Sequence, residues 1–268
     1  MADPRPDQAP ETDKQTGVAG IPAATVVIFR RAPDGGPPQI LMQVRSRDLA
    51  FAGGMAVFPG GRIDDSDRTL AATTDFPDRD EAAHRIAAIR ETLEETGLVL
   101  GLRGEIDATR AAEARGILLE HEKLAPVLDR FDWTLALDEL VPFARWFPKN
   151  ERLSRIFDTR FYLADLGTGA VDIAVDAQEN TRLFWTSATD ALSAADRGEI
   201  EVIFPTRRNL ERLALFASFS EARKQAEETP VRMIVPYVEE GPDGKRVCIP
   251  TDCGYPVTSV PLHTAKRG

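Results

Sequence analysis

The chain has 268 residues, a formal net charge of −10 at pH 7 and a sequence pI of about 5.0. This acidity argues against broad nucleic-acid binding, and no apolar run approaches the ~20 residues of a membrane-spanning helix. The length allows one large domain or two small ones, and the two cysteines, Cys248 and Cys253, are too few for a disulfide framework, so we expect them to be packing residues.

The first part of the chain predicts a polar tail followed by strands. Residues 1–20 are polar, rich in Pro, Asp and Gln, and lack the apolar core of a signal peptide. We therefore expect them to be disordered and the protein to be cytoplasmic. Apolar runs at 23–31 and 40–47 flank the turn cluster "DGGPPQ" and predict a hairpin. A short strand at 53–61 ends in the turn "FPGG", and residues 62–79 predict an acidic, irregular segment.

The clearest predicted helix spans residues 80–96, with Asp80 as its N-cap and Gly97 just after its C-terminus. At 100° per residue, one side carries an apolar stripe, which predicts packing into a core. The three glutamates of "RETLEETG" (90–97) fall within about 100° on the opposite side. The stripe consists of Ala82, Ile86, Ile89 and Leu93.

The rest of the chain mixes helical and strand-like segments without an internal repeat or a clear linker. This mixture indicates an α/β or α+β fold. We expect helices over 107–130, 187–199 and 205–228, and strands over 139–147, 157–165 and 181–187.

The carboxylates beside Gly97 are unfavourable for an isolated helix. They face the negative end of the macrodipole and repel one another at i,i+3 and i,i+4 spacing, at a cost of about 1 kcal/mol in total. Arg90 can offset part of this, and a hard cation such as Mg²⁺ would offset more. A solvated acidic face is the alternative interpretation. The upstream turn "FPGG" favours the metal, because its glycines let the backbone approach a ligand closely, and such a pairing suits metal-assisted chemistry on a phosphate.

Residues 90–98, "RETLEETGL", resemble the core of the Nudix box, REUXEEXGU, where U is a bulky apolar residue. Thr92 departs from the pattern, and the paired glycines that open the box match Gly60 and Gly61. The resemblance implies an α/β fold, the Nudix α/β/α sandwich with a mixed sheet. It further implies a single domain over 21–268, with a helical insert at about 105–135 and a C-terminal extension.

The chain also departs from the Nudix box in spacing. The box has fourteen residues from its glycine to its arginine, whereas the step from Gly61 to Arg90 is longer by about fifteen. The first glutamate of the box, eight residues before the arginine, falls on Ala82. Candidates for its supporting role are Asp64, Asp65, Asp80 and Glu81.

This long insertion resembles the acyl-CoA diphosphatase branch of the superfamily. The segments "FARWFPKNERLSRIFDTRFYLA" (143–164) and "FPTRRNLERLA" (204–214) resemble that branch too. Upstream, "LMQVRSRDLAFAGGMAVFPGG" resembles the CoA-type signature LLTxRSxxLRxxxGxVxFPGG. The second arginine of the signature falls on Ala50, and Arg47 is a candidate substitute.

The resemblance implies roles for specific residues. Three glutamates would bind Mg²⁺ or Mn²⁺, a backbone carbonyl of the paired glycines could add a ligand, and Arg90 would orient the glutamates. Glu179 is the candidate for a distal carboxylate that acts as metal ligand or general base, with an exposed loop glutamate as the alternative. The implied metal ligands are Glu91, Glu94, Glu95, Gly60 and Gly61.

Several cationic and aromatic residues have two interpretations. Arg45 could bind the diphosphate or a CoA 3′-phosphate or be a surface arginine, and Arg160 is a further candidate for the substrate. We expect His84 to be a bystander, although it shares the helical face of the glutamates. We expect Phe157 and Phe161 to be core residues.

The implied reaction is metal-dependent hydrolysis of a diphosphate linkage in a nucleoside diphosphate linked to another moiety. CoA or acyl-CoA, giving 3′,5′-ADP and (acyl-)4′-phosphopantetheine, is the expected substrate, with ADP-ribose, NADH and nucleotide sugars as alternatives. A non-catalytic module that senses a nucleotide is the rival from another class. The implied partner is a small nucleotide-type molecule, without nucleic acid or membrane, and a homodimer is allowed.

Overall fold

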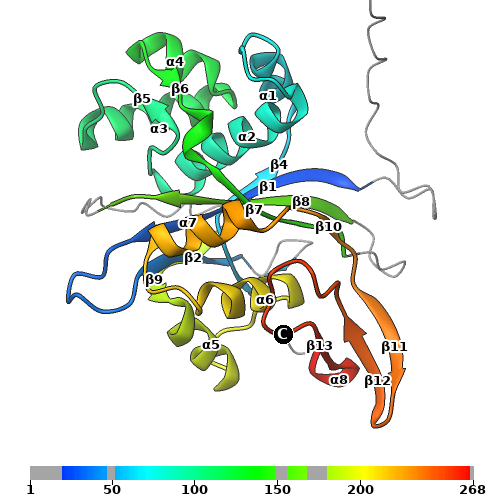
Figure 1. The fold of residues 1–268 in the computed structure, drawn as a ribbon. Helices are drawn as coiled ribbons and strands as arrows, with labels where there is room; N and C mark the ends of the chain where they lie inside the picture. Colours follow the sequence, from blue (N-terminus) through cyan, green and yellow to red (C-terminus); the bar gives the residue numbers. More distant parts are fainter. Residues whose placement is uncertain (1–19, 47–51, 149–155, 168–179, 266–268) are drawn as a thin grey trace, which may run out of the picture.

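A mixed β-sheet forms the middle layer of the protein (Figure 1). The computed structural model describes residues 20–46, 52–148, 156–167 and 180–265. The strands of the sheet are β1 (Ile21–Arg30), β2 (Gln39–Arg45), β3 (Ala56–Val57), β4 (Gly60–Arg62), β7 (Val141–Trp146), β8 (Phe157–Asp165), β9 (Asn180–Ser187) and β10 (Met233–Ile234). Their order is β10-β7-β8-β1-β2-β3, with β4 beside β1 and β9 beside β2. β1 pairs in parallel with β8, and β1 and β2 form the predicted antiparallel hairpin.

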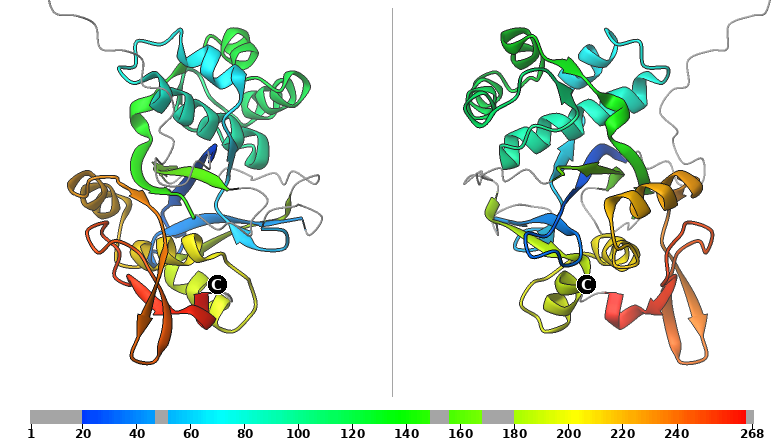
Figure 2. Two further views of the ribbon diagram at one scale, coloured as in Figure 1. Left: turned by 90° about the vertical axis from the view of Figure 1, so that its right-hand side faces the viewer. Right: turned by 60° about the vertical axis from the view of Figure 1, so that its left-hand side comes forward.

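Helices cover both faces of this sheet, and Figure 2 shows the three layers from two further directions. One face carries α1 (Asp65–Ala71), α2 (Arg79–Thr96), α3 (Ala108–His121), α4 (Ala125–Phe131), the short hairpin β5 (Leu102–Arg103) and β6 (Thr134–Leu135), and the 3-10 helix η1 (Leu137–Glu139). The other face carries α5 (Ala188–Asp196), α6 (Phe204–Leu213) and α7 (Phe219–Glu228). A small sheet follows, made of β11 (Tyr237–Gly241), β12 (Gly244–Cys248) and β13 (Ser259–Pro261), and then α8 (Leu262–Ala265).

The central strand β1 shows why both faces are covered. Val26 and Ile28 belong to the apolar cluster under α2, whereas Val27 and Phe29 belong to the cluster on the opposite face. A strand that is buried on both sides reads as a continuous apolar run instead of an alternating one. The predicted α/β/α sandwich with a mixed sheet is therefore confirmed.

Helix α2 lies in the centre of its layer and is buried on nearly all sides. The predicted stripe is confirmed, since Ala82, Ile86, Ile89 and Leu93 are at most 1% exposed. The predicted N-cap at Asp80 is wrong by two residues, because the side chain of Asp78 accepts hydrogen bonds from the first-turn amides. Gly97 ends the helix in the left-handed conformation, with φ of 74°.

Three segments differ from the sequence prediction. The segment predicted to be irregular contains α1, which Asp64 caps by a reciprocal capping box with Asp67. The helix predicted over 107–130 is divided into α3 and α4, because the chain turns at Glu122 in a left-handed conformation and Pro126 starts the next helix. The helix predicted over 205–228 is divided into α6 and α7, since Ser218 caps a new helix there.

The C-terminal extension is attached to the sandwich by a buried hydrogen-bond chain. The indole Nε1 of Trp146 on β7 donates to the hydroxyl of Tyr255 at 2.9 Å, and that hydroxyl donates to Asn209 Oδ1 on α6 at 2.6 Å. Cys248 and Cys253 are buried and form no disulfide, as expected for packing residues. Among the helices that the structure describes, none combines the length and apolar character that crossing a bilayer requires.

Replacing Tyr255 by phenylalanine should destabilise the fold by about 1–3 kcal/mol, because it removes the hydroxyl that pairs buried groups of Trp146 and Asn209. Urea unfolding followed by tryptophan fluorescence measures this change. The matched control is Tyr237→Phe in the same extension. Tyr237 is 45% exposed, so this change should stay within about 0.5 kcal/mol. Equal effects of the two variants would contradict the anchoring role of Tyr255.

Candidate active site

The paired glycines bring β4 into close contact with β1 and with α2. Gly60 has φ of 152°, and a Cβ atom there would lie 2.3 Å from the carbonyl oxygen of Ala24. A Cβ atom at Gly61 would lie 2.2 Å from Oε1 of Glu91. A side chain at Gly60 would push β4 away from β1, and one at Gly61 would displace the carboxylate of Glu91. The glycine turn is therefore required for a carboxylate of α2 to lie against this backbone.

Glu95 connects α2 to the sheet. Its Oε2 accepts the backbone N–H of Gly60 and the side-chain Nε2 of Gln43, each at 2.8 Å. The residue is only 2% exposed. The prediction that all three glutamates point away from the core is therefore wrong for Glu95, because β2 and the glycine turn cover that side of the helix.

Arg90 holds the other carboxylates together. Its guanidinium is buried and donates to Asp67 through Nε and Nη2, both at 3.0 Å, and to the carbonyl oxygen of Arg62 at 2.9 Å. Nη1 donates to Glu91 Oε1 at 2.9 Å and to Glu94 Oε2 at 3.3 Å. Arg90 thus contacts Glu91 and Glu94 through a single nitrogen, whereas its bidentate pair is with Asp67, and its role in orienting the glutamates stays a prediction.

The carboxylates nevertheless exceed the positive charge available to them. Burial, followed by the charges of Glu95 and Glu94, raises the pKa of Glu91 to about 8, although Arg90 opposes the shift. The side chain of Glu91 is 14% exposed and that of Glu94 is 32% exposed. A further cation beside Glu91 would relieve this repulsion.

Asp67 is the contact of Arg90 that the sequence analysis missed. The position of the first glutamate of the Nudix box can be counted from the arginine or from the glycine of the box. Counting back eight residues from Arg90 gives Ala82, which is fully buried in the apolar stripe. Counting forward six residues from Gly61 gives Asp67, so the insertion follows this residue instead of preceding it. Of the four proposed substitutes, Asp64 comes within 3.5 Å of Arg90. Asp65 makes no side-chain contact with Arg90, and Asp80 and Glu81 pair with Arg160.

A cleft of about 690 Å³ opens beside the glycine turn. Its polar lining residues include Arg45, Arg62, Glu91 and Glu94. The Nε of Arg45 is buried and has no hydrogen-bond partner in the described part of the chain. The apolar lining of the cleft comes from both halves of the chain. It includes Val57, Phe58, Pro148, Phe157, Phe161, Ile203 and Pro205.

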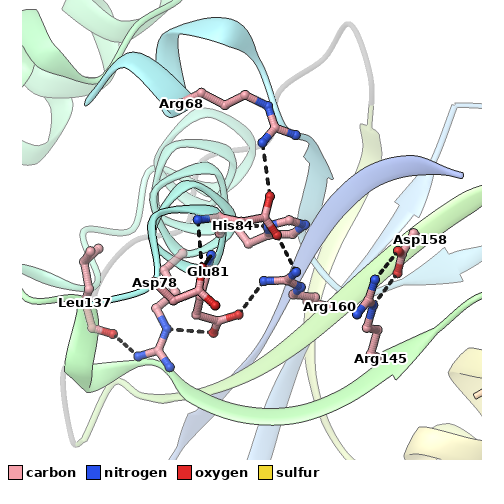
Figure 3. A network of polar contacts seen from close by, with 10 residues as sticks. Arg68, Asp78, Glu81, His84, Leu137, Arg145, Asp158 and Arg160 are labelled. Atoms are coloured by element: carbon pink, nitrogen blue, oxygen red, sulfur yellow. Dashed lines mark hydrogen bonds and ion pairs between the residues drawn. The ribbon is translucent and has the colours of Figure 1, made fainter. Parts of the chain in front are cut away.

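His84 on α2 and Arg160 on β8 belong to a separate network of polar contacts, which Figure 3 shows. Arg160 on β8 pairs with Asp80 and with Glu81 near the start of α2 and does not line the cleft. His84 is 3% exposed and its Nδ1 lies 2.7 Å from the carbonyl oxygen of Asp80. Burial, followed by the charge of Arg160, lowers the pKa of His84. This network joins the helix to the sheet, and His84 does not line the cleft.

The remaining predicted residues either line the cleft or lie outside the described residues. Phe161 is 7% exposed and belongs to the core, as expected, and it also forms part of the cleft wall with the half-buried Phe157. Arg47 and Glu179 lie outside the described residues, so their roles stay predictions.

The donor chemistry of the site suits a divalent cation. Carboxylate and carbonyl oxygens are the ligands that Mg²⁺ and Mn²⁺ prefer. Within the described ranges, no three carboxylate, imidazole or thiol groups converge in ligating geometry, since Arg90 engages Glu91 and Glu94. The residues fit a metal by their type, by the charge excess at Glu91 and by the open approach beside Gly61.

Comparisons with known proteins agree with this geometry. The chain is 27% identical over 202 residues to acyl-coenzyme A diphosphatase NUDT19 of Gallus gallus, which is 66% of this chain and 53% of that protein. The chain thus spans about half the length of this curated relative. The crystal structure of a Nudix hydrolase from Alicyclobacillus acidocaldarius superposes with a TM-score of 0.65 at 25% identity, over 77% of this chain and 96% of that one.

A comparison with models of protein families gives a further match. The model of the NUDIX domain matches residues 21–166, which are more than half of the chain and include β1, the glycine turn and α2. The predicted family is confirmed, and the protein belongs to the Nudix domain family.

Proposed function

We propose that the protein is a metal-dependent Nudix hydrolase that cleaves a diphosphate linkage in a nucleoside diphosphate linked to another moiety. The observation that carries the proposal is that Glu95 and Glu91 lie against Gly60 and Gly61, beside a cleft of substrate size that Glu94 also lines. The rival, a sensing module without turnover, gives no account of why a buried site retains three mutually repelling carboxylates.

The metal would be held by oxygen atoms that the fold has gathered. Glu91, Glu94 and Glu95 would supply carboxylates, and Gly60 or Gly61 a backbone carbonyl. When bound, Mg²⁺ or Mn²⁺ supplies charge neutralisation of the diphosphate and a lowered pKa of water. Water contributes the hydroxyl that replaces the leaving phosphate oxygen, and hydrolysis breaks one P–O bond of the anhydride. Glu179 remains the predicted group for the proton of that water.

The chain's own residues would orient the substrate. Arg45 lines the cleft, and its guanidinium suits a phosphate oxygen. Arg90 keeps Glu91 and Glu94 in place and is itself fixed by Asp67. Phe157 and other apolar wall residues would exclude water from the remainder of the ligand.

CoA or acyl-CoA is the substrate that we propose. Its diphosphate would lie beside the polar lining residues of the cleft, and its pantetheine arm or acyl chain beside the apolar ones. The relative from Gallus gallus is named an acyl-coenzyme A diphosphatase. ADP-ribose, NADH and nucleotide sugars share the diphosphate but carry polar groups in place of the acyl chain.

Product analysis tests the reaction. With Mg²⁺ or Mn²⁺, the protein should release 3′,5′-ADP from CoA and from a medium-chain acyl-CoA. Glu95→Gln should lower kcat by about 100-fold or more, because even outer partners of metal ligands cost 10–100-fold. Glu139→Gln is the matched control, since the side chain of Glu139 is exposed, pairs with Arg103 and does not line the cleft. Turnover of ADP-ribose, NADH or a nucleotide sugar alone would overturn the CoA assignment, and tight binding without turnover would favour the sensor.

A pair of arginine variants separates substrate binding from fold stability. Arg45→Ala should raise KM by about 10–100-fold, because a charge-assisted hydrogen bond contributes roughly 1.5–3 kcal/mol. Arg160→Ala should leave KM nearly unchanged but lower the free energy of unfolding by about 1–3 kcal/mol, since it breaks the pairs with Asp80 and Glu81. Steady-state kinetics and urea unfolding measure both. A KM effect of Arg160→Ala equal to that of Arg45→Ala would refute this division.

In the absence of metal, the raised pKa of Glu91 should make the free energy of unfolding depend on pH. In EDTA, the folded chain keeps a proton on this group up to about pH 8, whereas the unfolded chain loses it near 4.5. The free energy of unfolding contributed by this group therefore falls as pH rises from about 4.5 to 8. Glu91→Gln lacks this loss and should gain at least about 1 kcal/mol relative to the wild type between pH 5 and pH 8. Urea unfolding at both pH values measures the gain.

Metal addition supplies the second half of this test. Mg²⁺ should stabilise the wild type at pH 8 more than it stabilises Glu91→Gln, because it binds the folded state through that carboxylate. Glu139→Gln should follow the wild type throughout. Parallel pH profiles of wild type and Glu91→Gln in EDTA would show that the pKa of Glu91 is not raised in the folded chain.

A further inference from the structure

The buried side chain of Gln43 lies directly behind the carboxylate site. Successive residues of β2 face opposite layers, and Leu41 belongs to the cluster under α2, whereas Ile40 and Met42 belong to the opposite cluster. Gln43 therefore faces α2, and it is 0% exposed. Its two neighbours across the sheet are Val57 on β3 and Leu183 on β9. A polar amide thus lies among apolar strands.

This amide has one hydrogen bond in the described part of the chain, and it goes to Glu95. Nε2 donates to Glu95 Oε2 at 2.8 Å across 52 residues of sequence. The other end of the amide, Oε1, is buried and lacks a hydrogen-bond partner there. The opposite amide orientation would place two acceptor oxygens against each other, so the carboxylate itself fixes which end faces it.

An unsatisfied buried carbonyl costs free energy, and leucine at this position would avoid that cost. Packing therefore does not account for a glutamine here. The contact with Glu95 does, because the same Oε2 also accepts the N–H of Gly60. Two donors from two strands converge on one carboxylate oxygen, which restricts the rotation of the Glu95 carboxylate about its last bond.

The hydrogen bond between Gln43 and Glu95 depends on a residue at which this chain departs from the CoA-type signature. In the alignment of LLTxRS with "LMQVRS", the threonine position is occupied by Gln43. A threonine hydroxyl lies one bond beyond Cβ, whereas the glutamine amide nitrogen lies three bonds beyond it. Glu95 is thus held by a side chain that is longer than the threonine of that signature.

We propose that Gln43 is a positioning residue, whose amide together with Gly60 N–H orients the Glu95 carboxylate for a divalent cation. The inference rests on the proposed function, because it assigns to Glu95 a metal. Partners of this outer kind, which hydrogen-bond a metal ligand, typically change metal affinity or activity by 10–100-fold when removed.

Direct Mn²⁺ binding tests the proposal without relying on turnover. Free Mn²⁺ is measured by EPR while the metal-free full chain is titrated. Gln43→Leu, which fills a similar volume but donates no hydrogen bond, should raise the Mn²⁺ Kd by about 10-fold or more. At saturating metal its kcat should fall while KM for CoA stays within about twofold. Met42→Leu, on the opposite face of β2, is the matched core control and should match the wild type.

A double-mutant cycle then asks whether Gln43 acts through Glu95. In the Glu95→Gln background, Gln43→Leu should change the Mn²⁺ Kd by less than about twofold, because the carboxylate that it positions is gone. The urea midpoint of Gln43→Leu should stay at or above that of the wild type, since an unsatisfied buried carbonyl is removed. Should this variant fail to fold, the unbranched Gln43→Met replaces it in the same tests.

The outcomes separate this inference from the proposed function. A wild type that binds Mn²⁺ and turns over substrate, with Gln43→Leu binding Mn²⁺ equally well, overturns the role of Gln43 and leaves the function. An equal loss in both backgrounds also overturns it, because Gln43 would then act independently of Glu95. A wild type that neither binds Mn²⁺ nor hydrolyses any diphosphate overturns both.

Discussion

The buried guanidinium of Arg90 is the interaction on which the carboxylate site depends. Glu91 and Glu94 would repel each other at the end of α2, and Arg90 contacts both while bonding to Asp67 behind them. Such a buried charge is stable only when its hydrogen bonds are satisfied. The guanidinium meets this condition with oxygen atoms from α1, α2 and β4. The local order of these three elements is thereby coupled to the geometry of the carboxylates.

The segment between the glycine turn and α2 contributes to the site through α1. Asp67 on α1 is 1% exposed and reaches Arg90 as an aspartate, which is one methylene shorter than the glutamate of the pattern. The helices that follow α2 support the same region, since Arg115 on α3 donates to the carbonyl oxygen of Glu94 at 2.9 Å. That contact satisfies one of the free carbonyls in the last turn of α2.

The cleft extends beyond the part of the chain that matches the family. Ile203, Pro205 and Thr206, at the start of α6, form part of its wall, although the family match ends at residue 166. The segment after the match is held against the sandwich by the chain from Trp146 through Tyr255 to Asn209. Selectivity for the group beyond the diphosphate would therefore depend on residues from both segments.

The sequence by itself determined the family, the sandwich, the apolar stripe of α2 and the glutamates at its end. The family and the sandwich follow from the resemblance to the Nudix box, whereas the stripe and the glutamates follow from local spacing, which a helix converts directly into a face. The sequence also indicated that Gly60 and Gly61 belong to the site, because only glycine lets the backbone approach its neighbours so closely.

Only the tertiary structure decided which distant groups meet these residues. Asp67 was missed because the insertion could lie on either side of it, and only folding shows which carboxylate reaches Arg90. Gln43 reads in the sequence as a polar residue within a strand, and its contact with Glu95 spans 52 residues. Arg160 matched the branch pattern but faces the start of α2, because strand direction and register place it there. Spacing along the chain fixes neighbours within an element, whereas contacts between elements depend on how their faces pack.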